Sequence, residues 1–354
     1  MDSCLVGSEM CIRDRDYSNV ELSSSLKALL SGLLGSGKAL PIMTLEKTIS
    51  KIPESKMPHH KLISTSKEDR LRHTRGQSLS DWFSMHSGAI DCFTDGVAFP
   101  RSNDEVKELL LFASENNINV IPYGGGTSVV GHINPERHGK LNLTISMANM
   151  TRLLDLDPIS LLARFQPGAN GPQIENQLNE EGFTLGHFPQ SWEYSTLGGW
   201  IASRSSGQQS LKYGRIENLF AGGKIVTPKG TLVIPTCPAS SAGPDLRQFI
   251  LGSEGRMGII TEASVRISPL PKSEYFGAVF FPCWNSGMCA VRKIVQENID
   301  LSMMRLSNSL ETTSLMFMGG KSPEVINKLN SDLLSKGIQS CLLYTSPSPR
   351  DTNP

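Results

Sequence analysis

The chain has 354 residues, and its 34 basic side chains balance its 34 acidic ones. Because nucleic-acid binding needs a basic excess against the phosphates, this balance argues against a nucleic-acid partner. No run of residues approaches the ~18 consecutive apolar positions of a membrane-spanning helix. A hydrophobic content of 38% is ordinary for a globular protein, and the length predicts roughly two domains.

The cysteine and histidine spacings favour neither a disulfide framework nor a metal site. The four cysteines from Cys92 to Cys289 contain no Cys-x-x-Cys pair. The adjacent His59 and His60 would point in different directions from any regular element. We therefore expect no bound metal.

The first third of the chain predicts few regular elements. Leu22–Leu34 is rich in serine and leucine and is compatible with a short amphipathic helix, whereas Pro53–Pro58 is typical of a linker. The basic side chains of Arg70–Gly76 are expected to face solvent, with contact to a phosphate as the alternative. A helix is predicted to begin after Ser102, because that hydroxyl can cap it and apolar residues recur at helical spacing from Val106.

Strands and helices then alternate, which predicts a mixed α and β fold. Pro228-Lys229-Gly230 separates two strands and is typical of a hairpin turn. The predicted strands are Val120–Tyr123, Leu141–Ile145, Ala163–Pro167, Lys224–Thr227, Thr231–Ile234, Ile259–Ile267, Tyr275–Phe281 and Ser302–Leu306, and the predicted helices are Gln173–Glu181, Asn285–Glu297 and Ser322–Ser335.

A triple glycine follows the strand that ends at Tyr123. Gly124-Gly125-Gly126-Thr127-Ser128 offers backbone N–H groups free of β-carbons, together with two hydroxyls, which suits a bound diphosphate. The spacing is not the Gly-x-Gly-x-x-Gly fingerprint of dinucleotide-binding folds. A tight surface turn is the alternative interpretation of the same residues.

Three more motifs follow in order: Pro189–Gly207, Tyr213–Leu219 and Gly252–Glu262. Together with the glycine loop they resemble the FAD-binding domain of the vanillyl-alcohol-oxidase-type flavoproteins, and within that superfamily they resemble the alkylglycerone-phosphate synthase family. The resemblance is collinear from about Leu71 to about Leu306. It implies an α+β fold with a two-subdomain FAD-binding domain over residues 71–271, an N-terminal extension over 16–70, and the start of a substrate cap over 272–340.

The resemblance also implies which residues bind FAD. Relatives that attach their flavin covalently commonly carry a histidine in or beside this loop. Because Thr127 and Ser128 stand at those positions here, we expect FAD to be bound non-covalently. Gln190 stands where the synthases usually have an acidic residue. The residues expected to bind FAD are Pro122, Tyr123, Gly124, Gly125, Gly126, Thr127, Ser128, Gln190, Ser191, Trp192, Glu193, Tyr194, Ser195, Thr196, Ser203, Arg204, Ser205, Ser206, Glu254, Gly255, Arg256, Met257, Gly258, Ile259 and Ile260.

Arg305 is the catalytic candidate, because it matches an arginine that the synthase family needs. A guanidinium suits a phosphate or carboxylate substrate, although an ion pair on a cap strand would explain the residue equally well. The reaction implied is exchange of the acyl group of acyl-dihydroxyacetone phosphate for a long-chain alcohol in ether lipid synthesis, without net redox change. The alternatives are a dehydrogenase or oxidase of 2-hydroxy acids such as D-lactate or glycolate, and a flavoprotein that binds a ligand without turnover.

The resemblance also implies partners and a location. A lipid-like phosphate substrate would bring the protein to a membrane surface, and a homodimer is compatible with the family. We expect a cytoplasmic protein, or a peroxisomal one if its source is eukaryotic.

The two ends of the chain are related to each other at the level of DNA. Cys341–Asp351 can be encoded by a sequence whose reverse complement encodes Leu5–Asp14. Such a match predicts that residues 1–15 and 341–354 are a translated sequencing adapter, so both are excluded from the predicted fold. We expect the natural protein to continue beyond Ser340, with further catalytic groups there.

Overall fold

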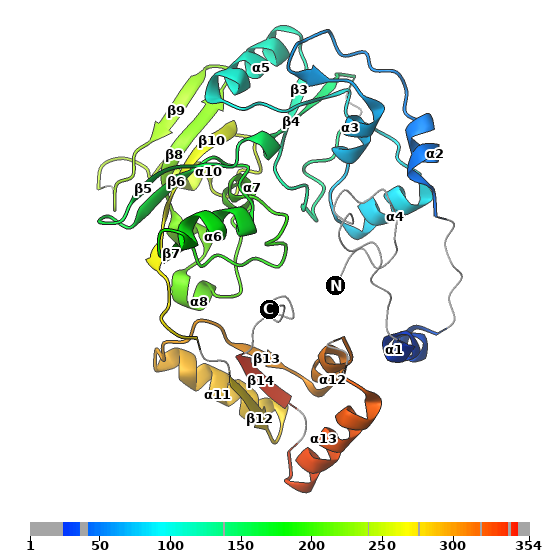
Figure 1. The fold of residues 1–354 in the computed structure, drawn as a ribbon, viewed down its shortest axis with the longest axis vertical. Coiled ribbons are helices and arrows are strands. Elements are labelled where there is room, and N and C mark those ends of the chain that lie inside the picture. The colour runs from blue at the N-terminus through cyan, green and yellow to red at the C-terminus, as the bar shows by residue number, and fades with distance from the viewer. Residues whose placement is uncertain are drawn as a thin grey trace. The chain divides into compact units, whose positions relative to one another are not determined.

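Figure 1 shows two compact units in the computed structural model, which describes residues 24–35, 42–136, 139–239, 241–274, 277–318, 321–338 and 341–345. The first unit contains the described residues from 42 to 270, and the second contains 24–35 and those from 271 onward. Residues 42–70 thus belong to the first unit rather than to an extension, because strand β1 (Ile63–Ser64) pairs with β2 (Gly96–Ala98). The first unit begins well before the predicted boundary at Leu71.

A four-stranded sheet carries the glycine loop. Its order is β1, β2, β4 (Asn142–Ser146) and β3 (Asn119–Tyr123), with β2 and β3 parallel to β4 and with β1 antiparallel to β2. The edge position of β3 accommodates Pro122, which has no backbone N–H to donate to a neighbouring strand.

Helix α5 (Asn103–Glu115) confirms the helix predicted to begin after Ser102. The Oγ of Ser102 accepts a hydrogen bond from the N–H of Glu105 at 3.2 Å, which satisfies one of the first free N–H groups of the helix. The apolar stripe from Val106 to Ala113 is buried in a core shared with β4. Local capping and packing therefore agree in forming this helix.

The second sheet is antiparallel and has five strands. Its order is β5 (Leu153–Asp157), β6 (Leu162–Phe165), β10 (Ile259–Arg266), β8 (Phe220–Thr227) and β9 (Gly230–Ile234). Strands β8 and β9 form the predicted hairpin, with Thr227 opposite Gly230. Mixed pairing in one sheet and antiparallel pairing in the other make the fold α+β, as predicted.

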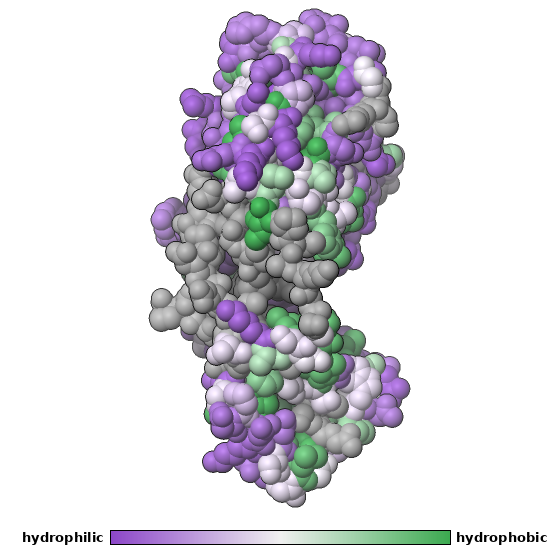
Figure 2. Space-filling view, turned by 90° about the vertical axis from the view of Figure 1, so that its right-hand side faces the viewer, coloured by the Kyte–Doolittle hydropathy of each residue, from purple (hydrophilic) through white to green (hydrophobic). Residues whose placement is uncertain are grey.

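The larger core of the first unit lies between this second sheet and its helices. Phe165 and Phe220 are fully buried beside residues of α6 (Gly171–Asn179), α7 (Leu197–Ser203) and α9 (Ile216–Leu219). On the face shown in Figure 2, apolar residues lie in small groups between hydrophilic ones. The remaining elements of this unit are α2 (Leu45–Ser50), α3 (Lys67–Arg72), α4 (Leu79–Ser87), η1 (Met147–Asn149), β7 (Phe183–Thr184), α8 (Ser210–Tyr213), α10 (Arg247–Ile250) and β11 (Ser268–Pro269).

The basic segment Arg70–Gly76, which lies between β1 and β2 in the chain, is not solvated as predicted. Arg70 is 1% exposed, and its Nε and Nη1 donate hydrogen bonds of 2.8 Å each to the carbonyl oxygens of Thr94 and Pro53. Arg72 pairs with Glu68 on the same helix at 2.7 Å. Carbonyl oxygens from two distant segments give the Arg70 guanidinium the partners that burial requires, and they also tie Pro53, the start of the predicted linker, to the domain.

The second unit contains a three-stranded sheet and four helices among its described residues. The sheet order is β12 (Gly277–Phe281), β14 (Cys341–Thr345) and β13 (Arg305–Ser307). The helices are α1 (Ser24–Leu34), α11 (Trp284–Gln296), α12 (Ser309–Met318) and α13 (Pro323–Ser335). No helix in the described parts of the chain has the length and apolar character needed to cross a membrane.

Strand β14 consists of residues that the sequence analysis excludes from the fold. It lies between β12 and β13 and pairs antiparallel with both. Strand pairing joins backbone groups, so a short segment of strand-favouring residues can complete a sheet whatever its origin. The adapter origin of residues 341–354 stays a prediction, whereas the expectation that all of them lack a partner in the fold is wrong for these five.

Candidate functional site

The glycine loop leaves the edge strand β3 and lies directly against residues 194–196. A β-carbon on Gly125 would overlap the carbonyl oxygen of Tyr194, and one on Gly124 would overlap Oγ1 of Thr196. Gly126 has a φ of 64°, in the left-handed region that favours glycine. These glycines were predicted to leave space for a ligand, but the atoms that a β-carbon would meet at Gly124 and Gly125 belong to Thr196 and Tyr194.

The segment that meets the loop is held by hydrogen bonds at the start of α7. Thr196 caps this helix with its side-chain oxygen. The Oγ of Ser195 donates to the carbonyl oxygen of Ser191 at 2.7 Å and accepts from Nε1 of Trp200, also at 2.7 Å. These bonds fix the turn that presents residues 194–196 to the glycine loop.

The third glycine cluster closes the same region from the other side. The N–H of Glu254 donates to the carbonyl oxygen of Ala202 at 2.9 Å, at the end of α7. Gly255 has a φ of 82°, and a β-carbon there would lie 2.8 Å from Cγ of Pro122. Segments about 130 residues apart in the sequence therefore pack against one strand end.

These three segments line a cavity of about 460 Å³. The residues that were predicted to bind a cofactor and that line it are Pro122, Tyr123, Gly124, Gly125, Gly126, Thr127, Ser128, Ser191, Ser195, Thr196, Ser203, Ser205, Ser206, Glu254, Gly255, Gly258, Ile259 and Ile260. The predicted residues that lie outside its lining are Gln190, Trp192, Glu193, Tyr194, Arg204, Arg256 and Met257.

Arg204 and Trp192 show why membership of a motif does not place a side chain in the cavity. Arg204 ends α7 with a φ of 53°, and its guanidinium bonds to Glu217 at 3.0 Å. Trp192 packs against Gly171 and against the ring of Phe188. Both side chains are therefore committed to contacts within the protein.

The lining also contains residues outside the predicted set. They are Val129, Val130, His132, Ile133, Met147, Pro167, Gly198, Gly199, Trp200, Ala202 and Ser253. Met147 was detectable in principle, because β3 and β4 are parallel and ligands collect at the carboxyl ends of parallel strands. Pro167 comes near only through the packing of the second sheet, which no local pattern reveals.

Comparison with known proteins identifies the domain that contains most of this cavity lining. A family model described as an FAD binding domain matches residues 94–234, which include the glycine loop and the start of α7. The chain carries a vanillyl-alcohol-oxidase-type FAD-binding domain.

The most similar proteins include alkyldihydroxyacetonephosphate synthases. The synthase of Dictyostelium discoideum is 37% identical over 77% of this chain and 45% of its own length. A solved structure of alkyldihydroxyacetonephosphate synthase superposes with a TM-score of 0.81 at 32% identity, covering 90% of this chain and 62% of the other. A mitochondrial D-lactate dehydrogenase (cytochrome) of Saccharomyces cerevisiae is 32% identical over 70% of this chain and 45% of its own length. The chain thus spans about half the length of these curated relatives.

The cavity of the FAD-binding domain fits the phosphates of FAD. The N–H groups of Gly125, Gly126 and Thr127 donate to no other residue in the described parts of the chain, so they are available to ligand oxygens. Hydroxyls of Ser195 and Ser205 add polar groups to the lining. Backbone N–H groups at a glycine turn are a usual means of holding phosphate.

His132 and Ser128 form a pair inside the FAD-binding cavity. Nδ1 of His132 lies 3.1 Å from Oγ of Ser128, and both residues line the cavity. Burial lowers the pKa of His132, which Glu254 opposes and Arg256 reinforces. The net lowering favours the neutral form of this imidazole beside the glycine loop.

His187 lies behind the cavity wall of the FAD-binding domain. It is fully buried, and its Nε2 is 2.9 Å from the Oγ of Ser205, which lines the cavity. The ring also lies edge-on to Trp200, with the ring centroids 5.0 Å apart. Burial lowers the pKa of His187 to about 4, so this imidazole stays uncharged at neutral pH.

Arg305, the catalytic candidate, lies on β13 of the second unit and is not part of the cavity lining. Its guanidinium pairs with Glu311, and about half of its side chain is exposed. This is the ion pair that the sequence analysis gave as the alternative to a catalytic role. A substrate phosphate would have to share this guanidinium with Glu311 or displace it.

Replacing Gly125 by alanine is expected to weaken FAD binding at least tenfold, because the added carbon must push residues 194–196 away from the loop. Fluorescence titration of the apoprotein with FAD measures the effect. Gly32→Ala is the control, since a β-carbon there meets nothing within 4 Å, and its affinity should match the unsubstituted protein. Equal affinity of the Gly125 variant would contradict the packing constraint.

His187 is expected to make the first unit sensitive to acid. Its pKa rises from about 4 in the folded state to the ordinary 6.5 on unfolding, so between these values the unfolded chain binds the extra proton. The free energy of unfolding should fall by up to roughly 3 kcal/mol from this group as pH drops from 7 to 4. In His187→Gln the fall, measured by urea unfolding, should be correspondingly shallower. The exposed His59→Gln should keep the original slope, and an unchanged slope in both variants would refute the assignment.

Proposed function

We propose that the full-length protein is an FAD-dependent enzyme of the alkyldihydroxyacetonephosphate synthase type, which exchanges the acyl group of acyl-dihydroxyacetone phosphate for a long-chain alcohol. The supporting observation is the extent of the structural likeness. It covers 90% of the chain, so it includes residues of the second unit as well as the FAD-binding domain. Because FAD-binding domains serve many reactions, likeness beyond that domain is what favours one reaction class.

In this proposal the glycine loop binds the cofactor and Arg305 binds the substrate. The N–H groups of Gly125, Gly126 and Thr127 hold the cofactor phosphates, and the packed segments around them exclude water from one side of the cavity. FAD, when bound, supplies the reactive ring that ordinary side chains cannot provide. Arg305 supplies a fixed positive charge with a planar fork of donors, which suits the substrate phosphate.

We also propose that FAD is held without a covalent bond. Nδ1 of His132, the histidine of the cavity lining, lies 3.1 Å from the hydroxyl of Ser128, and the glycine loop itself carries Thr127 and Ser128 rather than a histidine. Hydrogen bonds and packing are then the contacts that retain the cofactor.

Acid precipitation tests this mode of attachment on the purified, FAD-loaded chain. The absorbance near the flavin maximum is expected to pass entirely into the supernatant, since denaturation destroys every non-covalent contact. The same precipitation with free FAD and an unrelated protein calibrates adsorption. Colour that stays with the washed precipitate beyond that level would show a covalent link.

A second candidate function is oxidation of a 2-hydroxy acid. The likeness to the Saccharomyces cerevisiae D-lactate dehydrogenase supports it, although at lower identity than the likeness to the synthase of Dictyostelium discoideum. The two reactions differ in the oxidation state in which they leave the flavin. Hydroxy-acid oxidation reduces the flavin, whereas acyl-for-alcohol exchange leaves it oxidised after each turnover.

The deciding experiment uses the chain completed with the natural continuation of its gene. Labelled hexadecanol is expected to replace the acyl group of acyl-dihydroxyacetone phosphate, giving labelled alkyl-dihydroxyacetone phosphate and a released fatty acid. D-lactate and glycolate are expected to leave the flavin absorbance unchanged in stopped flow. Arg305→Lys should lower the exchange rate at least tenfold, because an ammonium cannot reproduce the planar fork. Lys321→Arg, an exposed exchange of the same two residue types, serves as the control. Bleaching by D-lactate without alcohol incorporation would establish the dehydrogenase instead.

A further inference from the structure

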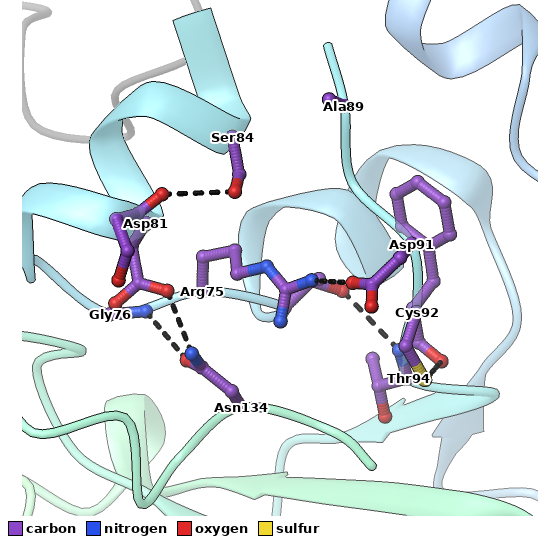
Figure 3. A network of polar contacts seen from close by, with 12 residues as sticks. Arg75, Gly76, Asp81, Ser84, Ala89, Asp91, Cys92, Thr94 and Asn134 are labelled. Carbon is purple, nitrogen blue, oxygen red and sulfur yellow. Dashed lines mark hydrogen bonds and ion pairs between the residues drawn. The ribbon is translucent and has the colours of Figure 1, made fainter. Parts of the chain in front are cut away.

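A chain of polar contacts lies behind the glycine loop, outside the cavity lining. Figure 3 shows Asp81 of α4, Asn134 and the backbone of Gly76 pointing toward one another. Asp81 is 3% exposed, so its carboxylate depends on protein partners. One oxygen, Oδ2, accepts hydrogen bonds from the N–H and the hydroxyl of Ser78, at 3.2 Å and 2.6 Å, and so caps α4.

The other carboxylate oxygen is committed to Asn134. Oδ1 of Asp81 accepts a hydrogen bond of 2.7 Å from Nδ2 of Asn134. The amide oxygen of Asn134 accepts the N–H of Gly76 at 3.1 Å. The order of donors and acceptors is thus defined along the whole chain, because the carboxylate can only accept and the amide must donate toward it.

This chain of contacts reaches the glycine loop through the backbone of Ser128. The N–H of Gln77 donates to the carbonyl oxygen of Ser128 at 2.6 Å, and a β-carbon on Gly76 would overlap that same oxygen. Ser128 lines the cavity, whereas Asp81, Asn134 and Gly76 do not. The capped start of α4 is therefore connected to the last residue of the loop by three hydrogen bonds: Asp81 with Asn134, Asn134 with Gly76, and the adjacent Gln77 with Ser128.

We propose that Asp81 and Asn134 are positioning residues for the cofactor: their hydrogen bond fixes the far end of the glycine loop in the conformation that presents its N–H groups to FAD. The proposal rests on FAD binding in this cavity. A loop that is already ordered before binding loses less conformational freedom when the ligand arrives, so rigidity here contributes directly to affinity.

The pair allows an unusually strict test, because its two side chains have nearly the same shape. In Asn134→Asp, a carboxylate oxygen replaces the Nδ2 donor opposite Oδ1 of Asp81, so a hydrogen bond becomes a contact between two acceptors. In Asp81→Asn combined with Asn134→Asp, the amide on residue 81 donates to the carboxylate on residue 134. Oxygen atoms still face Ser78 and the N–H of Gly76, and the net charge is unchanged.

Titration of the apoprotein with FAD, together with the rate of FAD release, tests the proposal. Asn134→Asp is expected to raise the dissociation constant at least tenfold, mainly through faster release. The exchanged double variant is expected to return to within about twofold of the unsubstituted protein. Asn176→Asp, which adds one negative charge at an exposed position of α6, controls for the charge alone and should leave the affinity unchanged.

The outcomes distinguish failure of the proposed cofactor site from failure of the positioning role. If the unsubstituted chain binds no FAD, the proposed cofactor site itself is wrong. If it binds FAD and Asn134→Asp binds equally well, while circular dichroism shows both proteins folded, the positioning role is wrong. Loss of affinity that the double variant fails to restore would also overturn the proposal, since it would trace the effect to something other than this hydrogen bond.

Discussion

The close contact between Gly124–Gly125 and residues 194–196 is the constraint on which the shape of the cavity depends. It joins the end of a parallel strand in one sheet to the start of α7, which packs against the other sheet. The two halves of the first unit meet backbone to backbone at Gly125, whereas Gly124 meets the side chain of Thr196, and neither position has room for a β-carbon. Each half contributes what the other lacks, namely unpaired N–H groups from the loop and a rigid, capped helix terminus from α7.

Buried polar groups hold the surroundings of this contact in place. Arg70, on α3 between β1 and β2, binds carbonyl oxygens of Thr94 and Pro53, and the backbone N–H of Glu254 binds the end of α7. Such groups stabilise only while their partners are present, because an unpaired buried donor or acceptor costs about 1–3 kcal/mol. The site is consequently shaped by residues that never reach a ligand.

What the sequence could predict follows from the range of the interactions. The cap and apolar stripe of α5 are local, and the pattern therefore predicted that helix correctly. The order of the glycine-rich motifs likewise predicted the FAD-binding domain. Arg70 was expected in solvent because its partners lie on distant segments. Arg204 was expected at the cofactor because it belongs to a motif of the resembled family. Its left-handed φ and its bond to Glu217, which direct the side chain elsewhere, arise only in the folded chain.

The spacing of the three cavity segments has a consequence for synthesis of the chain. The glycine loop is translated by residue 128, but the last wall of the cavity arrives only with residues 253–260. At the ~5–20 residues per second of translation, roughly 7 to 27 s separate the two. During that interval a nascent chain has the glycine loop but not the complete cavity. FAD can therefore bind and stabilise only chains in which the third glycine cluster has already been synthesised. Cofactor supply would therefore act on the yield of finished first units and leave their early folding untouched.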